Sequence, residues 1–393
     1  MSAQVSLRSI GPSVYLPSLL FGIGQGAIAP AIALSARELG ASVAAAGLIV
    51  AVGGVGRVVA DLPAGMLAVR IGERRAMLLA TALSMAGLVL CIAATAVWML
   101  AVGILCQGLA TSVWGLARQA YLTEIMPYRL RARALSTLGG MTRIGLFVGP
   151  FLGAGVMQFM GTDGAYWLHL AAALLAAGVL IALPDIRHGS TSGRDRPRDG
   201  TALIVRRHGP VLRTLGTSAL IVGAVRASRQ VVLPLWAEHI GLDPATTSLV
   251  FGLSGAVDML LFYPAGLAMD RVGRRWVAVP SMVVLGIAHI LLPLTASVGT
   301  LTAIAMLMGL GNGMGSGLIM TIGADVSPNA SRATFLGAWR LFADVGNGVG
   351  PLAVAVMTSL TALGPAIVAM GGVAWLGAAS MWWWIPKYGR PRQ

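Results

Sequence analysis

Charged side chains lie inside apolar segments of this 393-residue chain, where burial is costly and chemistry becomes available. A charge near the centre of a bilayer costs at least ~2.5–3.5 kcal/mol on insertion scales, so such residues pair, bind solutes or carry protons. The charged residues inside the apolar segments are Arg57, Asp61, Arg118, Arg143, Arg226, Arg229, Asp258, Arg340 and Asp344. They are the candidate functional residues.

The candidate residues belong to a repeat with an offset of 201 residues. Arg57 corresponds to Asp258, and Arg143 corresponds to Asp344. The same offset relates Pro63-Ala64-Gly65 to Pro264-Ala265-Gly266, and Gly145, Gly149 and Pro150 to Gly346, Gly350 and Pro351. Self-similarity at a fixed period indicates two copies of one structural unit. In an apolar chain, two six-helix halves are typical of secondary transporters.

The elements that position these residues are predicted transmembrane helices. The chain is 56% hydrophobic and 11% charged, and its apolar runs are long enough to cross a hydrocarbon core of ~30 Å. We predict an all-α integral membrane protein with twelve helices at 12–34, 44–68, 76–96, 98–125, 134–160, 165–184, 211–239, 246–269, 276–297, 299–325, 334–360 and 363–386. Residues 1–184 and 211–393 form two pseudo-symmetric six-helix bundles, and the polar segment 185–210 links them.

The net charge of +14 orients the chain in the membrane. Most of the 28 arginines and lysines fall in loops on one predicted face, whereas Arg37 lies on the other. Basic loops stay in the cytoplasm, so we predict a multi-pass protein of the cytoplasmic (inner) membrane with both termini cytoplasmic. The same distribution argues against nucleic acid as a partner, because the charge orients the protein rather than forming a binding face.

Two loops resemble the signature loop of the major facilitator superfamily. The second copy, Gly266 to Arg275, is close to the family pattern, whereas the first has Val69 in place of the family's aspartate and Glu73 in place of a basic residue. The residues that carry this resemblance are Gly65, Arg70, Gly72, Arg74, Gly266, Asp270, Arg271, Gly273 and Arg274. Their glycines allow a tight turn with positive φ. The resemblance covers nearly the whole chain and implies the twelve-helix facilitator fold.

The fifth predicted helix resembles the glycine-proline motif of exporters in this family. Its residues are Gly145, Gly149, Pro150 and Gly153, and the final glycine of the motif is missing. The resemblance implies a drug or metabolite exporter, that is, a proton-coupled antiporter of the multidrug-resistance kind. The alternative reading of each glycine, including Gly311, Gly313, Gly315 and Gly317, is close helix packing.

The resemblance also implies which buried charges meet. In this family helix 2 packs against helix 11, and helix 5 against helix 8, so we predict inter-half gating pairs between Arg57 and Asp344, Arg143 and Asp258, and Asp61 and Arg340. The alternative is intrahelical pairing at i,i+4 spacing, Arg57 with Asp61 and Arg340 with Asp344.

Helices 1, 4, 7 and 10 line the central cavity of the family. The predicted cavity residues are therefore Gln25, Arg118, Arg226, Arg229, Gln230 and Asn312. Surplus arginine favours a substrate with carboxylate or phosphate groups, which guanidinium binds bidentately. Alternatively, these arginines bond backbone carbonyls or extend to the headgroups.

Proton coupling needs a carboxylate that binds and releases a proton near neutral pH. The candidates are Asp61, Asp258 and Asp344, in that order. We therefore predict a transporter that moves a small organic solute by alternating access, with proton-coupled efflux. The alternatives are uptake of an anionic metabolite and a lipid flippase. No clustered catalytic set is visible in the sequence, so we expect no enzyme activity, no cofactor and no metal site. The expected partners are a small-molecule substrate, protons and the lipid bilayer, with the protein a monomer.

Overall fold

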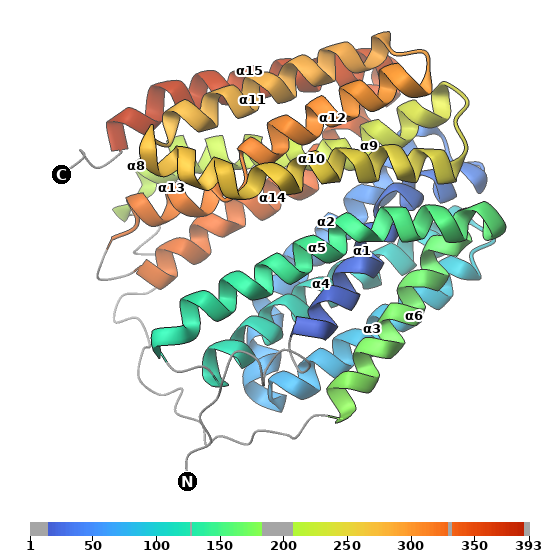
Figure 1. Cartoon of the computed structure of the whole chain (residues 1–393), viewed down its shortest axis with the longest axis horizontal. Coiled ribbons are helices and arrows are strands. Elements are labelled where there is room, and N and C mark those ends of the chain that lie inside the picture. The colour runs from blue at the N-terminus through green and yellow to red at the C-terminus, as the bar shows by residue number, and fades with distance from the viewer. Residues whose placement is uncertain (1–14, 126–127, 183–206, 329–331, 389–393) are drawn as a thin grey trace. The chain divides into compact units, whose positions relative to one another are not determined.

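The computed structural model describes residues 15–125, 128–182, 207–328 and 332–388. The first copy contains α1 (Leu16–Glu38), α2 (Val43–Ile71), α3 (Glu73–Ile92), α4 (Val97–Ile125), α5 (Tyr128–Met160) and α6 (Asp163–Ala182). The second contains α8 (Gly209–Val211), a π-helical turn (Leu212–Gly216), α9 (Thr217–His239), α10 (Pro244–Arg271), α11 (Arg275–Leu291), α12 (Val298–Met314), α13 (Leu318–Val326), α14 (Arg332–Leu360) and α15 (Leu363–Tyr388). Figure 1 shows these helices.

Twelve helical segments among the described residues are long and apolar enough to span a membrane, which confirms the predicted all-α fold. The ninth span ends in a 3₁₀ turn, and the tenth comprises α12 and α13 together. Most of the predicted linker, residues 185–206, lies outside the described residues.

Contacts divide the described residues into two compact units. The first comprises residues 15–182, without 126–127, and the segment Leu233–Gly255. The second comprises residues 207–232 and 256–388, without 329–331. This grouping differs from the predicted bundles in one segment, since Leu233–Gly255 contains the end of α9, the following loop and the start of α10.

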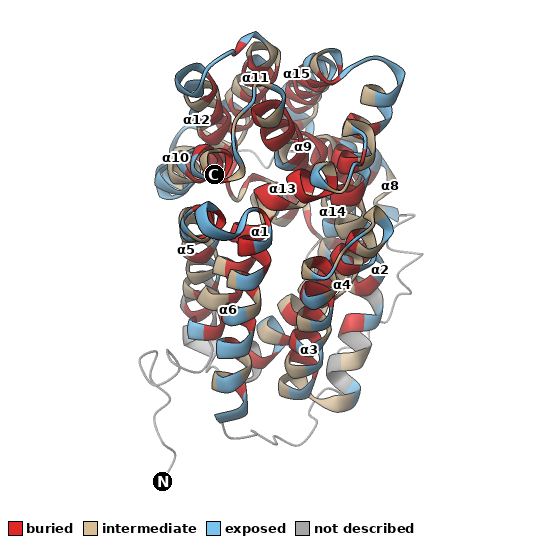
Figure 2. Cartoon of the chain, turned by 90° about the vertical axis from the view of Figure 1, so that its right-hand side faces the viewer, coloured by how far each residue is buried: buried red, intermediate tan, exposed pale blue. Residues whose placement is uncertain are grey.

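Within the first unit, α1 packs on α5 and α6, and α3 packs on α4 and α6. Figure 2 shows buried residues on the facing sides of these helices and exposed residues on the outward sides. Outward residues include large apolar side chains, such as Leu174, Leu175 and Ile181 of α6, each more than half exposed. Exposure of this apolar surface to water would be unfavourable, whereas the hydrocarbon core of a membrane accommodates it.

The glycines of α5 bring its backbone against α1. A Cβ atom at Gly145 would lie 2.7 Å from Ile23 N, and one at Gly149 would lie 2.7 Å from Ala27 N. The second copy repeats this contact, because a Cβ at Gly346 would overlap Leu220 O and lie 3.1 Å from Ala224 N. Small residues permit such approach in membranes, where helices gain no hydrophobic driving force from association. The glycines therefore have the packing role that the sequence left open.

Replacing Gly149 with alanine should destabilise the protein by about 1–3 kcal/mol, because the added methyl group overpacks the α1–α5 interface. Gly155 of the same helix has open space around its Cβ position, and Gly155→Ala should change stability by less than ~0.5 kcal/mol. Thermal unfolding of both variants in detergent measures the difference. Equal melting temperatures would contradict the packing role of Gly149.

An ion pair joins equivalent positions of the two copies inside the first unit. Arg37 Nε of α1 lies 3.0 Å from both Oε1 and Oε2 of Glu238 at the end of α9, and the two residues are 201 positions apart. Arg37 Nη1 also donates to Ala41 O at 2.6 Å. Ser248 Oγ of α10 donates to Pro150 O of α5 at 2.8 Å. These contacts attach Leu233–Gly255 to α1 and α5.

The coupling between Arg37 and Glu238 should be about 1 kcal/mol, because both side chains are about one-third exposed and water screens the pair. A double-mutant cycle with Arg37→Gln and Glu238→Gln, read by thermal unfolding, isolates this term. Strict additivity of the two single variants would show that the pair contributes nothing.

Candidate functional site

The tenth membrane span is interrupted beside the candidate charges. α12 ends at Met314, α13 begins at Leu318, and Gly317 between them has φ +76°. Glycine adopts this left-handed conformation without the steric cost of a Cβ atom. The sequence predicted a continuous helix over 299–325, and the equivalent α4 is indeed continuous. The signal was visible as Gly317, whose counterpart in α4 is Leu116.

Arg226 of α9 bonds the carbonyl groups at this interruption. Its Nε donates to Asn312 Oδ1 at 2.5 Å, its Nη2 donates to Asn312 O at 3.0 Å, and its Nη1 donates to Gly315 O at 3.3 Å. The last carbonyls of a helix have no intrahelical donor, and hydrocarbon offers no water to replace it. Arg226 therefore contacts Asn312, which is another predicted cavity residue. It also bonds backbone carbonyls, which was the alternative role considered for these arginines.

Asn312 connects Arg226 to a carboxylate on α10. Asn312 Nδ2 donates to Asp258 Oδ2 at 2.5 Å, and Ser316 Oγ lies 3.5 Å from Asp258 Oδ1. Arg229 Nη2 is 4.0 Å from Asp258 Oδ2. We call Arg226, Arg229, Asp258, Asn312 and Ser316 the α9–α10–α12 cluster. Sequence reasoning missed Ser316, which lies in the interruption itself.

The position of the cluster makes Asp258 sensitive to the backbone of α12. A Cβ atom at Gly313 would lie 2.7 Å from Asp258 O, so the two helices are in direct backbone contact. The Asp258 side chain is only about one-fifth exposed. Charge-assisted hydrogen bonds are stronger than neutral ones, so the state of this carboxylate affects how firmly Asn312 is held.

The first unit contains a second group of predicted cavity residues. Arg118 Nη1 of α4 donates to Thr142 Oγ1 of α5 at 2.9 Å, and its guanidinium lies 5.0 Å from the centre of the Trp114 ring. Phe21 of α1 stacks on Trp114 with ring centres 4.6 Å apart. Arg118 Nε and Gln25 Nε2 are buried and have no hydrogen-bond acceptor among the described residues.

Asp61 and Asp344 have partners on nearby segments of their own units. Asp61 Oδ1 of α2 accepts a hydrogen bond from Ser112 Oγ of α4. Arg340 Nε lies 3.3 Å from Asp344 Oδ2 within α14, which is one of the two intrahelical pairs considered as alternatives. The three inter-half pairs stay predictions. Gln230 is exposed on α9.

Comparison with known proteins identifies the family. The sequence profile of the major facilitator superfamily matches residues 14–228 and 215–393, which is nearly the whole chain. The chain belongs to the major facilitator superfamily. It is therefore a membrane transporter and not an enzyme.

Sequence relatives in the superfamily are distant. Multidrug resistance protein MdtL of Escherichia coli is 26% identical over 269 residues, 67% of this chain and 67% of MdtL. An uncharacterized MFS-type transporter of Mycobacterium tuberculosis is 25% identical over 181 residues, 43% of this chain and 26% of that protein. The chain therefore aligns with about a quarter of the length of the mycobacterial relative.

Solved structures agree on the fold. A bacterial homolog of the human lysosomal transporter Spinster superposes with a TM-score of 0.82 at 15% identity, covering 99% of this chain and 100% of that chain. The nucleoside transporter NupG gives a TM-score of 0.78 at 13% identity, covering 96% and 99%. At these identities the likeness shows the facilitator fold alone.

The two signature loops of the facilitator fold use their arginines differently. Gly72 and Gly273 have φ of +87° and +101°, which confirms the expected turns. In the second loop, Arg274 Nε lies 2.8 Å from Asp325 Oδ2, and its Nη1 lies 3.4 Å from Asp270 Oδ1. In the first, Arg74 donates to Leu180 O at 2.9 Å and to Ile181 O at 2.7 Å, at the end of α6.

Arg226→Ala should destabilise the transporter by at least ~2 kcal/mol, because the buried Asn312 loses the donors that Arg226 supplies to its Oδ1 and its backbone oxygen at the α12–α13 interruption. Arg226→Lys should fall between this variant and the wild type, since an ammonium group lacks the guanidinium fork. Gln230→Ala, at an exposed position on the same helix, is the matched control. Thermal unfolding in detergent gives the order, and an alanine variant as stable as the control would contradict the bonding role.

Proposed function

We propose that this facilitator exports a small organic solute in exchange for protons. Two observations support export: the similarity to MdtL, whose name denotes multidrug resistance, and the partial exporter motif in α5. The arginine-rich loops support a place in the cytoplasmic membrane with these loops and both termini inside the cell. The protein then acts by alternating access between two faces of the membrane.

The α9–α10–α12 cluster carries the proposal for coupling. Asp258 is the proton carrier in this scheme, because it contacts Asn312 and approaches Arg229 beside an interrupted helix. The sequence ranked Asp61 first. The observed contacts favour Asp258, since Asp61 has a serine as its described partner, whereas Asp258 contacts the element that can change conformation.

Protonation of Asp258 removes the negative charge that Asn312 Nδ2 and Arg229 face. Asn312 then loses a charge-assisted hydrogen bond. Because Asn312 also accepts a hydrogen bond from Arg226, this loss weakens the bonding of Arg226 to the α12 carbonyls. The interruption can rearrange, because Gly317 accepts either sign of φ. A proton entering from one face thus changes the backbone beside the predicted cavity helices. Deprotonation restores the cluster.

A second candidate function is uptake of an anionic metabolite. Arg118 favours it, because its buried Nε has no acceptor among the described residues and a carboxylate or phosphate would supply one. The stacked rings of Phe21 and Trp114 beside it suit a planar group. The direction of solute movement across the membrane distinguishes uptake from export, and one proteoliposome experiment tests both.

The test is proton flux in proteoliposomes that contain the purified protein and a pH-sensitive dye. Anionic, neutral and cationic compounds are added in turn from each side. We expect one class to trigger proton movement opposite to the solute. Asp258→Asn should lower this flux at least tenfold and retain exchange of solute for solute, because the amide cannot carry a proton.

Asp163→Asn is the control, since Asp163 is exposed at the start of α6 and belongs to none of the candidate sites. Asp61→Asn tests the other candidate carboxylate. Full proton flux in Asp258→Asn with loss in Asp61→Asn would move the proton site to Asp61. Solute movement without proton flux in the wild type would overturn the coupled mechanism.

A further inference from the structure

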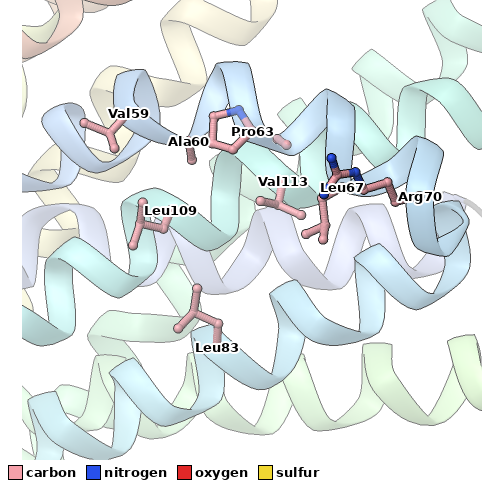
Figure 3. A pocket seen from close by; sticks show the side chains of 9 residues that line it. Val59, Ala60, Pro63, Leu67, Arg70, Leu83, Leu109 and Val113 are labelled. Carbon is pink, nitrogen blue, oxygen red and sulfur yellow. The ribbon is translucent and has the colours of Figure 1, made fainter.

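A groove on the first unit runs between α2, α3 and α4. Its volume is about 420 Å³, nearly three times the ~150 Å³ hollow that admits a benzene molecule. Its lining includes Val59 and Leu67 of α2, Leu83 of α3, and Leu109 and Val113 of α4. Arg70 is its one charged lining residue, and Figure 3 shows Arg70 and Val59 at opposite ends.

Small residues explain where the groove begins. In the middle of α2, next to the end of the groove away from Arg70, a Cβ atom at Gly56 would lie 2.8 Å from Leu105 O, so α2 and α4 touch through their backbones. Beyond this contact the lining residues Ala60 and Ala64 have side chains too short to fill the space towards α4. A groove lined by carbon atoms within membrane-spanning helices accepts hydrocarbon rather than water.

The charge at the end of the groove lacks a counter-charge from the described protein. Arg70 makes no hydrogen bond or ion pair with any other described residue. The residue before Arg70 is the apolar Val69, whereas the corresponding position of the second copy carries the acidic Asp270. Glu73 begins α3, where the helix dipole favours an acidic side chain.

The length of α2 brings Arg70 to the level of lipid headgroups. The helix has 29 residues, which at 1.5 Å per residue exceeds the ~30 Å thickness of the hydrocarbon core. Arg70 is its second-last residue. A guanidinium there meets lipid phosphate, to which it can donate two parallel hydrogen bonds.

We propose that this groove binds an anionic phospholipid, with one acyl chain along Leu67, Leu83, Leu109 and Val113 and the phosphate at Arg70. The lipid phosphate supplies a negative charge for Arg70. Its chain also fills the space between α2 and α4 that the small side chains leave open. The lipid site shares no residue with the α9–α10–α12 cluster, so a failure of the proposed proton coupling would leave the lipid proposal unaffected.

Native mass spectrometry of the full-length, delipidated protein tests this site. Phosphatidylglycerol and phosphatidylcholine with identical acyl chains are titrated separately. We expect the wild type to bind phosphatidylglycerol about fivefold more tightly, the factor for one basic residue near the membrane surface. Arg70→Gln should lose this preference, and Arg70→Lys should keep most of it. Arg75→Gln, an exposed position in the same loop region, should bind as the wild type does.

A groove-filling variant separates the acyl chain from the headgroup. Val113→Trp leaves every charge in place and should weaken binding of both lipids. Gel filtration shows whether Arg70→Gln folds. If it does not, Val113→Trp still tests whether the lipid binds in this groove. Inorganic phosphate in excess should not release the lipid. Retained preference in Arg70→Gln, equal loss in Arg75→Gln, unchanged binding in Val113→Trp or release by phosphate would each overturn the proposal.

Discussion

Inside hydrocarbon, a polar group must find its partner within the protein, and helices gain little by hiding apolar surface from a solvent that is itself apolar. Close packing and interhelical hydrogen bonds must therefore provide the attraction between helices. Glycine permits the close packing here, since Gly145 and Gly149 bring α5 against α1, and Gly346 and Gly350 bring α14 against α9. The side chains of α6 that point outward can be large and apolar because hydrocarbon accommodates them.

The same constraint shapes the candidate site. Interrupting a helix frees carbonyl groups, and the only solution in a dry environment is a donor from a neighbouring helix. Arg226 is that donor, and Asn312, to which it donates, itself donates a hydrogen bond to Asp258. A structural requirement and a chemically responsive carboxylate thus share one side chain, Asn312. Asn312 thus contacts both the guanidinium that bonds the α12 backbone and the carboxylate of α10.

The sequence predicted the features that depend on composition and repetition. Twelve spans follow from length and hydropathy. Close packing was the alternative reading of the α5 glycines, and the contacts of Gly145 and Gly149 recur at Gly346 and Gly350. The interruption at Gly317 was missed because this glycine was read as a packing residue, although the equivalent Leu116 of α4 distinguishes it from a conserved packing position of the repeat. Partner identity was harder still, since Ser112 and Ser316 are small polar residues with no signal of their own.

The ion pair between Arg37 and Glu238 has a consequence for how such a chain can arise. These positions correspond in the two copies, so in a protein newly formed by gene duplication they would have carried the same residue. Two arginines or two glutamates would repel one another there. The attraction exists because the two copies carry different residues at this position, and a symmetric dimer of one half, with the same residue on both sides, would lack it. The contact is therefore available only to a chain whose two copies differ at this position.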